Sequence, residues 1–145
     1  MGNGAARKIK MTTLEKKNLA FETIKNTPYL ELLGIEAVEF EIGKAVLCLP
    51  MHEKLRQPYG LLHGGATASL IDTAMAFAVV SVLSEDEKAT TVDLTVQYLR
   101  PHTEGVITCT AKITRAGKRL LFISAEVVNG ENKLIATALS TYTKV

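Results

Sequence analysis

The stretch that decides the fold runs from His63 to Leu83 and reads HGGATASLIDTAMAFAVVSVL. Its length and composition predict one helix from Gly64 to about Leu83, roughly 28 Å long at 1.5 Å per residue. The helix is apolar on nearly every side, so most of its surface must be buried. Its single charged side chain, Asp72, is costly to bury unless it is paired, hydrogen-bonded or functional. We therefore expect a core helix that carries a candidate site.

Shorter elements surround this helix. A capping box, TTLE at residues 12–15, predicts a helix that runs to about Lys25, and Thr27 is expected to cap a short turn that ends at Gly34. Alternating apolar and polar residues then predict a hairpin over residues 35–49, followed by a polar loop. After the long helix come four strands separated by good turn residues. Their expected ranges are 90–99, 106–115, 119–128 and 134–143.

The order of hairpin, long helix and four-strand meander predicts the fold class α+β. A curved antiparallel sheet that wraps round the helix is the simplest way to bury it. Residues 1–11 are expected to form a flexible tail, and residues 12–145 a single domain. One helix cannot cover both faces of a large sheet. Self-association through sheet edges or through helices is therefore expected.

Composition narrows the function classes. The chain has 17 Lys and Arg against 15 Asp and Glu, and a formal net charge of +2 does not point to nucleic acid. Cys48 and Cys109 lie in separate strand-like runs, which indicates buried free thiols rather than a disulfide framework or a metal site. The chain start has no apolar signal-peptide core, and a segment that contains Asp72 suits a protein core better than a membrane. We expect a cytoplasmic protein with no membrane partner.

The turn His63-Gly64-Gly65 is the first candidate for chemistry. Glycines let the backbone approach a ligand closely, and a helix start leaves free N–H groups at the positive end of the helix dipole. Such donors can stabilise an oxyanion. A tight turn or close packing would need the same glycines, so the pair alone does not decide between the two.

Asp72 is the second candidate. Ser69 and Ala76 share its helix face and leave room beside the carboxylate. A structural Asp, hydrogen-bonded to a neighbouring segment, is the alternative. Gly65 and Asp72 are about 10 Å apart along the axis, yet a nucleophile and an oxyanion donor must both lie about 3 Å from one carbonyl. If both are catalytic, a second copy must bring its Asp72 to the first copy's turn, which gives two equivalent sites.

Several other polar residues have two interpretations each. His63 could be a base or could brace the turn. Gln57 could polarise a carbonyl or place a water, or it could be a plain loop residue. Thr91 stands at a strand start, where threonine is common. The basic cluster at the next tight turn suits either a solvated hairpin tip or contacts to phosphate, and consists of Arg115, Lys118 and Arg119.

Taken in order, these residues resemble the hotdog-fold acyl-CoA thioesterases, in the branch typified by the phenylacetate-degradation thioesterase. The most specific stretch is LHGGATASLIDT at residues 62–73, and the resemblance extends from about Pro28 to Val145. Each supporting piece is weak alone, but the pieces occur in register. They are LGI at 33–35, Gln57 with Gly60, VDL at 92–94, YLRP at 98–101 and GK at 117–118.

The resemblance implies a sheet wrapped round the helix and chains paired into a homodimer, often into a dimer of dimers. It implies hydrolysis of acyl-CoA thioesters without a metal or organic cofactor. Asp72 would act as nucleophile or as general base, and the N–H of Gly64 or Gly65 would hold the thioester oxygen. Gln57 would polarise the carbonyl or place the water, and Thr91 would orient the water. The CoA phosphates would be contacted by Lys118, Arg119 and Arg100.

The residues leave three points open, namely a missing hydroxyl near the carboxylate, the acyl group and the competing functions. Some relatives carry a hydroxyl residue one turn after the carboxylate, where this chain has Ala76. Aryl-acetyl, hydroxybenzoyl and medium or long aliphatic acyl groups all suit an apolar pocket lined by small residues. The competing functions are an acyl-CoA-binding module and a hotdog hydratase or dehydratase. Hotdog modules that only bind acyl-CoA regulate transcription and carry a DNA-binding segment, which the piece before Pro28 is too short to form. Hotdog hydratases and dehydratases use a histidine in a different setting from that of His63.

Overall fold

The computed structural model describes residues 10–145, so the predicted tail lies almost wholly outside the described residues. The capping box is confirmed. The Thr12 hydroxyl accepts the Glu15 N–H at 3.1 Å, and the Glu15 carboxylate accepts the Thr12 N–H at 2.7 Å. Thr27 is the N-cap of the next helix, as predicted. Its side chain does not accept a hydrogen bond from the first turn of that helix, however, because the Thr27 hydroxyl donates to the Thr23 carbonyl instead.

The helices and strands follow the predicted order, and the strands lie within about one residue of the expected ranges. Only the polar loop differs, because it contains a short 3-10 turn with a buried Leu55. The elements are α1 (Thr13–Lys25), α2 (Pro28–Leu33), β1 (Glu36–Glu41), β2 (Lys44–Pro50), η1 (Glu53–Leu55), α3 (Gly64–Val82), β3 (Ala89–Tyr98), β4 (Val106–Ala116), β5 (Leu120–Val128) and β6 (Leu134–Lys144).

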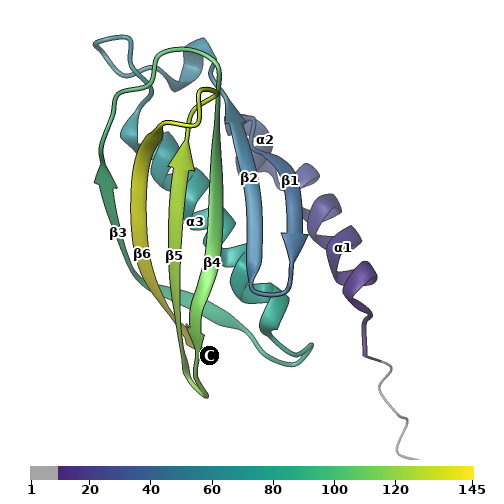
Figure 1. Ribbon diagram of the computed structural model, residues 1–145. Coiled ribbons are helices and arrows are strands. Elements are labelled where there is room, and N and C mark those ends of the chain that lie inside the picture. The colour runs from purple at the N-terminus through teal and green to yellow at the C-terminus, as the bar shows by residue number, and fades with distance from the viewer. Residues whose placement is uncertain (1–9) are drawn as a thin grey trace, which may run out of the picture.

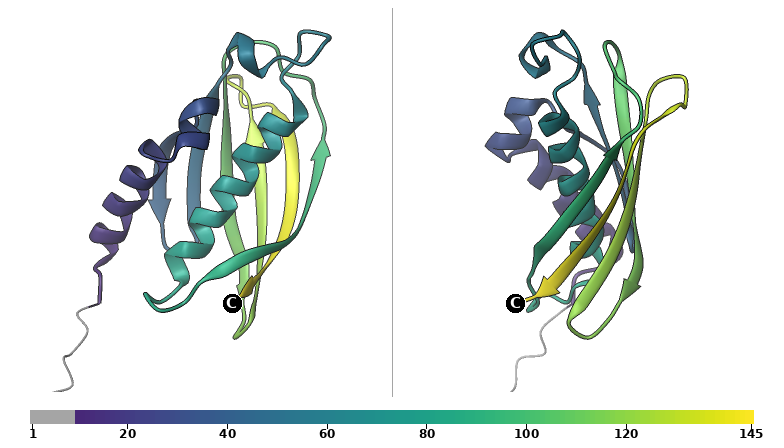
Figure 2. Two further views of the ribbon diagram at one scale, coloured as in Figure 1. Left: turned by 180° about the vertical axis from the view of Figure 1, so that it is seen from behind. Right: turned by 90° about the vertical axis from the view of Figure 1, so that its left-hand side faces the viewer.

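The strands form one antiparallel sheet in the order β1-β2-β4-β5-β6-β3. The sheet curves round α3, which lies across one of its faces (Figure 1; Figure 2). The predicted α+β class and the wrapped arrangement are therefore confirmed. Helix α1 packs beside β1 at one edge of the sheet, whereas β3 forms the opposite edge.

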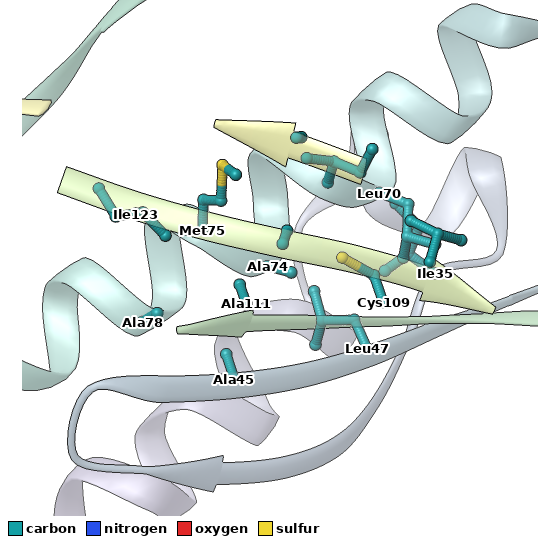
Figure 3. Close-up of a cluster of buried hydrophobic side chains, with 14 of the residues drawn as sticks. Ile35, Ala45, Leu47, Leu70, Ala74, Met75, Ala78, Cys109, Ala111 and Ile123 are labelled. Carbon is teal, nitrogen blue, oxygen red and sulfur yellow. The ribbon is translucent and has the colours of Figure 1, made fainter. Parts of the chain in front are cut away.

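The buried face of α3 supplies the centre of the core. Leu70, Ala74, Met75 and Ala78 are fully buried on this face. They meet inward side chains of the sheet, which include Ala45, Leu47, Cys109, Ala111 and Ile123 (Figure 3). Small residues on both sides let the helix approach the sheet closely. Both cysteines are free thiols, as predicted, but the predicted burial holds only for Cys109 and is wrong for Cys48, which is partly exposed. Burial raises the pKa of Cys109 to about 12, so this thiol stays protonated.

The opposite face of α3 carries small side chains and is only partly covered. Ser69, Thr73 and Ala76 are half-buried, and Val80 is 58% exposed. Within residues 10–145, α3 is the one helix that is long and apolar enough to cross a membrane. Its close packing on the sheet is nevertheless that of a core helix, as the sequence predicts.

Truncating the core of α3 tests this arrangement. Leu70→Ala removes a fully buried side chain from the helix–sheet interface. We expect it to lower the free energy of unfolding by about 2–5 kcal/mol, the range for a large-to-small core change. Leu32→Ala is the matched control, since Leu32 is 65% exposed on α2. Urea unfolding would measure both, and equal losses for the two variants would contradict the described core.

Candidate functional site

Two hydroxyl groups from neighbouring strands hold the carboxylate of Asp72. The Thr91 hydroxyl on β3 lies 3.3 Å from Asp72 Oδ1, and the Tyr142 hydroxyl on β6 donates to the same oxygen at 3.1 Å. Tyr142 is 3% exposed, and its hydroxyl also lies 3.3 Å from the Asp72 carbonyl oxygen. Burial, helped by the negative charge of Asp72, raises the pKa of Tyr142 above its usual value. The phenol therefore stays protonated and acts as a donor.

A bulge in β3 brings Thr91 to this position. Thr91 pairs with Tyr142 and Asp93 pairs with Thr141, so Val92 is an extra residue between the two pairs. Leu94 pairs with the buried Ser140, on the face of the sheet that packs on the helix. In a regular strand Thr91 would point to the other face, because side chains alternate. The extra residue reverses that alternation and points Thr91 toward α3.

The start of α3 is held by His63 and Tyr98. His63 is the N-cap, and its Nδ1 accepts the Gly65 N–H at 2.8 Å. This contact is the one that the turn-bracing interpretation of His63 expects. The Tyr98 hydroxyl donates to the Gly64 carbonyl at 2.8 Å. No residue from 10 to 145 accepts a hydrogen bond from the Gly64 N–H, so Gly64 and not Gly65 presents a free donor.

Close packing requires a glycine at position 65 more strictly than at position 64. A Cβ atom on Gly65 would lie 2.9 Å from His63 Nδ1 and would displace the cap. A Cβ atom on Gly64 would lie 3.3 Å from the Tyr98 ring, which is tight but can be relieved by a small shift. The close-packing interpretation therefore holds for Gly65, and a free N–H distinguishes Gly64.

Gln57 and Arg100 lie on the Gly64 side of the molecule. Together with Gly64 and Tyr98 they line a pocket of about 330 Å³. Gln57 is half-buried, and its side-chain oxygen accepts the Tyr59 N–H. The Arg100 guanidinium donates to the Leu134 carbonyl at 3.2 Å. Three of the predicted site residues therefore share one pocket.

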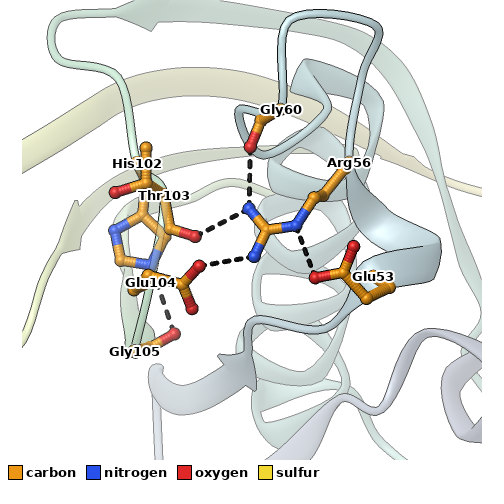
Figure 4. A network of polar contacts seen from close by, with 7 residues as sticks. All are labelled: Glu53, Arg56, Gly60, His102, Thr103, Glu104 and Gly105. Carbon is orange, nitrogen blue, oxygen red and sulfur yellow. Dashed lines mark hydrogen bonds and ion pairs between the residues drawn. The ribbon is translucent and has the colours of Figure 1, made fainter.

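An ion-pair network fixes the loop that carries Gln57. The guanidinium of Arg56 bonds the carboxylates of Glu53 at 2.8 Å and Glu104 at 2.5 Å (Figure 4). It also donates to the carbonyl oxygens of Gly60 at 2.7 Å and Thr103 at 3.0 Å. The loop before α3 is thereby tied to the segment that follows β3. Arg56 braces the pocket without lining it.

The predicted basic residues fall into two groups at opposite ends of β3. Lys118 and Arg119 lie in the β4–β5 turn, and the Arg119 carbonyl accepts the Lys144 N–H at 2.8 Å. Lys144 pairs with Ala89, so this turn lies near the start of β3, as does Arg115 at the end of β4. Arg100 follows the other end of β3.

The predicted site residues thus form two half-sites in one chain. One contains Asp72 and Thr91, and the other contains Gly64, Gln57 and Arg100. Gly64 and Asp72 are eight residues apart on α3, which corresponds to about 12 Å along its axis. Among residues 10–145, no group of three or more His, Cys, Asp or Glu could hold a metal ion.

The sequence did not predict Tyr142 or Arg56 as site residues, and Tyr98 was noted only as part of the YLRP motif. A tyrosine in an apolar strand is usually a core residue, and nothing local distinguishes Tyr142 from one. Its contact with Asp72 depends on the β3–β6 register and on the bulge. Arg56 could have been noted as a basic residue between Glu53 and Gln57, although its partner Glu104 is distant in sequence.

Comparison with known proteins defines the class. The thioesterase superfamily model matches residues 59–136, so this chain belongs to that family. It is 31% identical to the medium/long-chain acyl-CoA thioesterase YigI of Escherichia coli, over 82% of this chain and 86% of that protein. It is 31% identical to the 1,4-dihydroxy-2-naphthoyl-CoA hydrolase of Listeria monocytogenes, over 77% of this chain and 90% of that protein.

A solved structure gives the same assignment. The PaaI protein from the phenylacetic acid degradation operon of E. coli superimposes with a TM-score of 0.80 at 28% identity, and the match covers 87% of this chain and 90% of that one. The chain is therefore a hotdog thioester hydrolase of the PaaI-like type. The predicted resemblance is confirmed.

Removing the Tyr142 hydroxyl tests its bond to Asp72. We expect Tyr142→Phe to lower the free energy of unfolding at neutral pH by about 1.5–3 kcal/mol, the range for a hydrogen bond to a charged group. The folded pKa of Tyr142 lies above the unfolded one. The stability that the phenol contributes is therefore complete below about pH 10 and decreases progressively as the pH rises from there toward the folded pKa.

Urea unfolding of both proteins between pH 8 and about 11 would check this, since tyrosine in an unfolded chain ionises near pH 10. The difference between wild type and variant should shrink above pH 10. Tyr29→Phe is the control, because the Tyr29 hydroxyl bonds Ser69 on α3 but not Asp72. A difference that stays constant with pH would exclude the buried phenol–carboxylate contact.

Proposed function

We propose that this chain hydrolyses acyl-CoA thioesters to a free acid and CoA at two equivalent sites of a homodimer. Each site would combine Asp72 and Thr91 of one chain with Gly64 and Gln57 of the other. The observation that carries this proposal is the separation of about 12 Å between Gly64 and Asp72 along one packed helix. A single chain cannot place both groups about 3 Å from one carbonyl carbon.

The free edge of β3 can form the interface of such a dimer. It is an edge strand of ten residues, and among residues 10–145 only β6 pairs with it. Antiparallel pairing of two β3 edges across a two-fold axis sets the start of each strand against the end of the other. The Asp72 half-site of one chain would thereby approach the Gly64 half-site of its partner. The same pairing supports a CoA site made of Lys118 and Arg119 with Arg100 of the partner subunit.

The chemistry requires only a carboxylate, a donor and water. Tyr142 and Thr91 both contact Asp72 Oδ1, and Oδ2 accepts no hydrogen bond from residues 10–145. As a nucleophile, Oδ2 attacks the thioester carbon and expels CoA thiolate, and water then opens the anhydride. As a general base, it takes a proton from the attacking water. In both routes one water is consumed, the Gly64 N–H stabilises the oxyanion, and the thiolate leaves with a proton.

The named relatives support this substrate class. YigI is named for medium/long-chain acyl-CoA and the Listeria enzyme for a naphthoyl-CoA, so both names specify a CoA thioester. Their acyl groups differ, which leaves the acyl specificity to the pocket of each protein. A cytoplasmic location and a dimer of dimers stay predictions of the sequence, and light scattering of the purified protein would measure the assembly.

Asp72→Asn tests the carboxylate. The amide keeps the size of the side chain but can neither attack nor take a proton at neutral pH. We expect folding and CoA binding to be retained, and kcat for release of free thiol from an acyl-CoA panel to fall at least about 10²-fold, as for loss of a general base. Glu131→Gln in the β5–β6 turn is the control. Turnover retained by Asp72→Asn would remove Asp72 from the mechanism.

Gly64→Pro tests the oxyanion donor. Proline lacks the N–H and is tolerated at the first helical position, and His63 before it is already extended, with φ −62° and ψ 130°. Gly64→Ala is the matched control, because it adds the Cβ atom beside Tyr98 but keeps the N–H. We expect kcat of the proline variant to lie about 10²–10³-fold below that of the alanine variant. Equal rates would exclude the Gly64 donor.

Mixing the two inactive variants tests the shared site. In a dimer of one Asp72→Asn chain and one Gly64→Pro chain, one site carries both changes and the other carries neither. An equimolar mixture that has exchanged subunits should recover about one quarter of wild-type activity, because half of the dimers are mixed and each has one intact site. A site within one chain would recover nothing, and that result would overturn the two-chain arrangement.

A further inference from the structure

A second and larger concavity lies between α1 and α3, on the side of α3 that faces β1. Both helices lie on the same face of the sheet, with β1 and β2 behind the space between them (Figure 2, left). The groove has a volume of about 800 Å³. That volume falls within the range of small-molecule sites, which are mostly apolar. We refer to it as the α1–α3 groove.

The lining of the α1–α3 groove includes a large apolar and partly aromatic surface. Phe40 of β1 is 4% exposed, and its ring packs against Phe77 of α3 with centroids 5.4 Å apart. Leu19 and Ala20 of α1 form one wall, and Val80 of α3 belongs to the other. Leu19 and Val80 are 55% and 58% exposed, so large apolar side chains remain uncovered on both sides of the groove. An apolar occupant would bury them.

Several polar groups of the α1–α3 groove are already engaged. The Ser81 hydroxyl donates to the Ala78 carbonyl at 2.6 Å and accepts the Gly43 N–H at 2.7 Å. Lys16 Nζ donates to the Leu83 carbonyl at 3.1 Å. The Glu87 carboxylate pairs with Lys144 Nζ at 2.9 Å. The remaining charged side chains of the lining include Glu41 and Lys88, which are both exposed. The surface between the two helices is therefore left to the apolar side chains, which favours a hydrocarbon.

The α1–α3 groove begins close to the Asp72 half-site. Ala76 lines it and lies one helical turn after Asp72, and Ala89 lines it two residues before Thr91. The far end is lined by Leu83, eleven residues after Asp72, which is about 16 Å along the helix axis. A C–C bond of about 1.5 Å advances a zigzag chain by about 1.3 Å per carbon, so this path matches roughly twelve carbons.

We propose that the α1–α3 groove binds the linear aliphatic acyl chain of the substrate, with the chain passing over Ala76 from the thioester beside Asp72. This inference rests on the proposed hydrolysis at Asp72 and adds its specificity. A straight medium-length chain fills the length of the groove, whereas a compact aryl group would occupy only the end nearest Asp72.

A chain-length series tests the proposal. For straight-chain acyl-CoA substrates from C4 to C12, we expect kcat/KM of the wild type to rise by up to about fourfold per added methylene, the fold-change that corresponds to about 0.8 kcal/mol per buried CH₂. Val80→Trp and Thr23→Trp fill the groove from opposite walls, at exposed positions that do not disturb the core. Leu32→Trp is the matched control, since Leu32 is exposed on α2 outside the groove.

The two groove variants should lower kcat/KM for C12-CoA at least about tenfold and leave C4-CoA within about twofold, because only the longer chain loses buried methylenes. The control should change neither. A wild-type kcat/KM that does not change with chain length would overturn the proposal. Equal losses of kcat/KM for C4-CoA and C12-CoA in the groove variants would also overturn it, and would indicate that a second copy of the chain covers the groove. Failure of the proposed hydrolysis is a different result, namely no thiol release from any acyl-CoA, C4 included.

Discussion

The rest of this structure depends on the distance that one packed helix places between its own functional groups. The buried face of α3 holds Leu70 and Met75 against the sheet, so neither end of the helix can move relative to the other. Gly64 and Asp72 consequently stay about 12 Å apart. The chain can supply a donor and a carboxylate, but not to the same carbonyl. The proposed chemistry therefore requires assembly with a second copy of the chain.

The edge strand β3 combines two functions because of a single bulge. Beyond the bulge, Leu94 and Val96 pack on the core, and the extra residue Val92 points Thr91 to that same face and onto Asp72. The outer edge of β3 is left without a partner among the described residues. The same ten residues therefore position the carboxylate and present the surface through which the partner's half-site would arrive.

The two sides of α3 differ in what they offer a substrate. On the β3 side, Tyr142 and Thr91 supply hydroxyl donors to a carboxylate, so that side suits the reacting thioester. On the β1 side, Phe40 and Phe77 line an apolar groove that suits a hydrocarbon. The small residue Ala76 lies between the two. The family fold explains thioester hydrolysis, whereas the selection of an acyl chain depends on side chains that the fold does not specify.

The sequence by itself determined the elements, the fold class and the candidate list. Periodicity and capping patterns are local, so the apolar run after His63, the TTLE box and the alternating strands could be recognised without tertiary contacts. The separation of Gly65 from Asp72 also follows from sequence alone, because helical rise is constant. The structure was needed to show which glycine N–H is free, because the orientation of the His63 side chain, which takes the N–H of Gly65, does not follow from the residue pattern. It alone joined Thr91 and Tyr142 to Asp72, since a bulge and a register between distant strands decide which face each side chain meets.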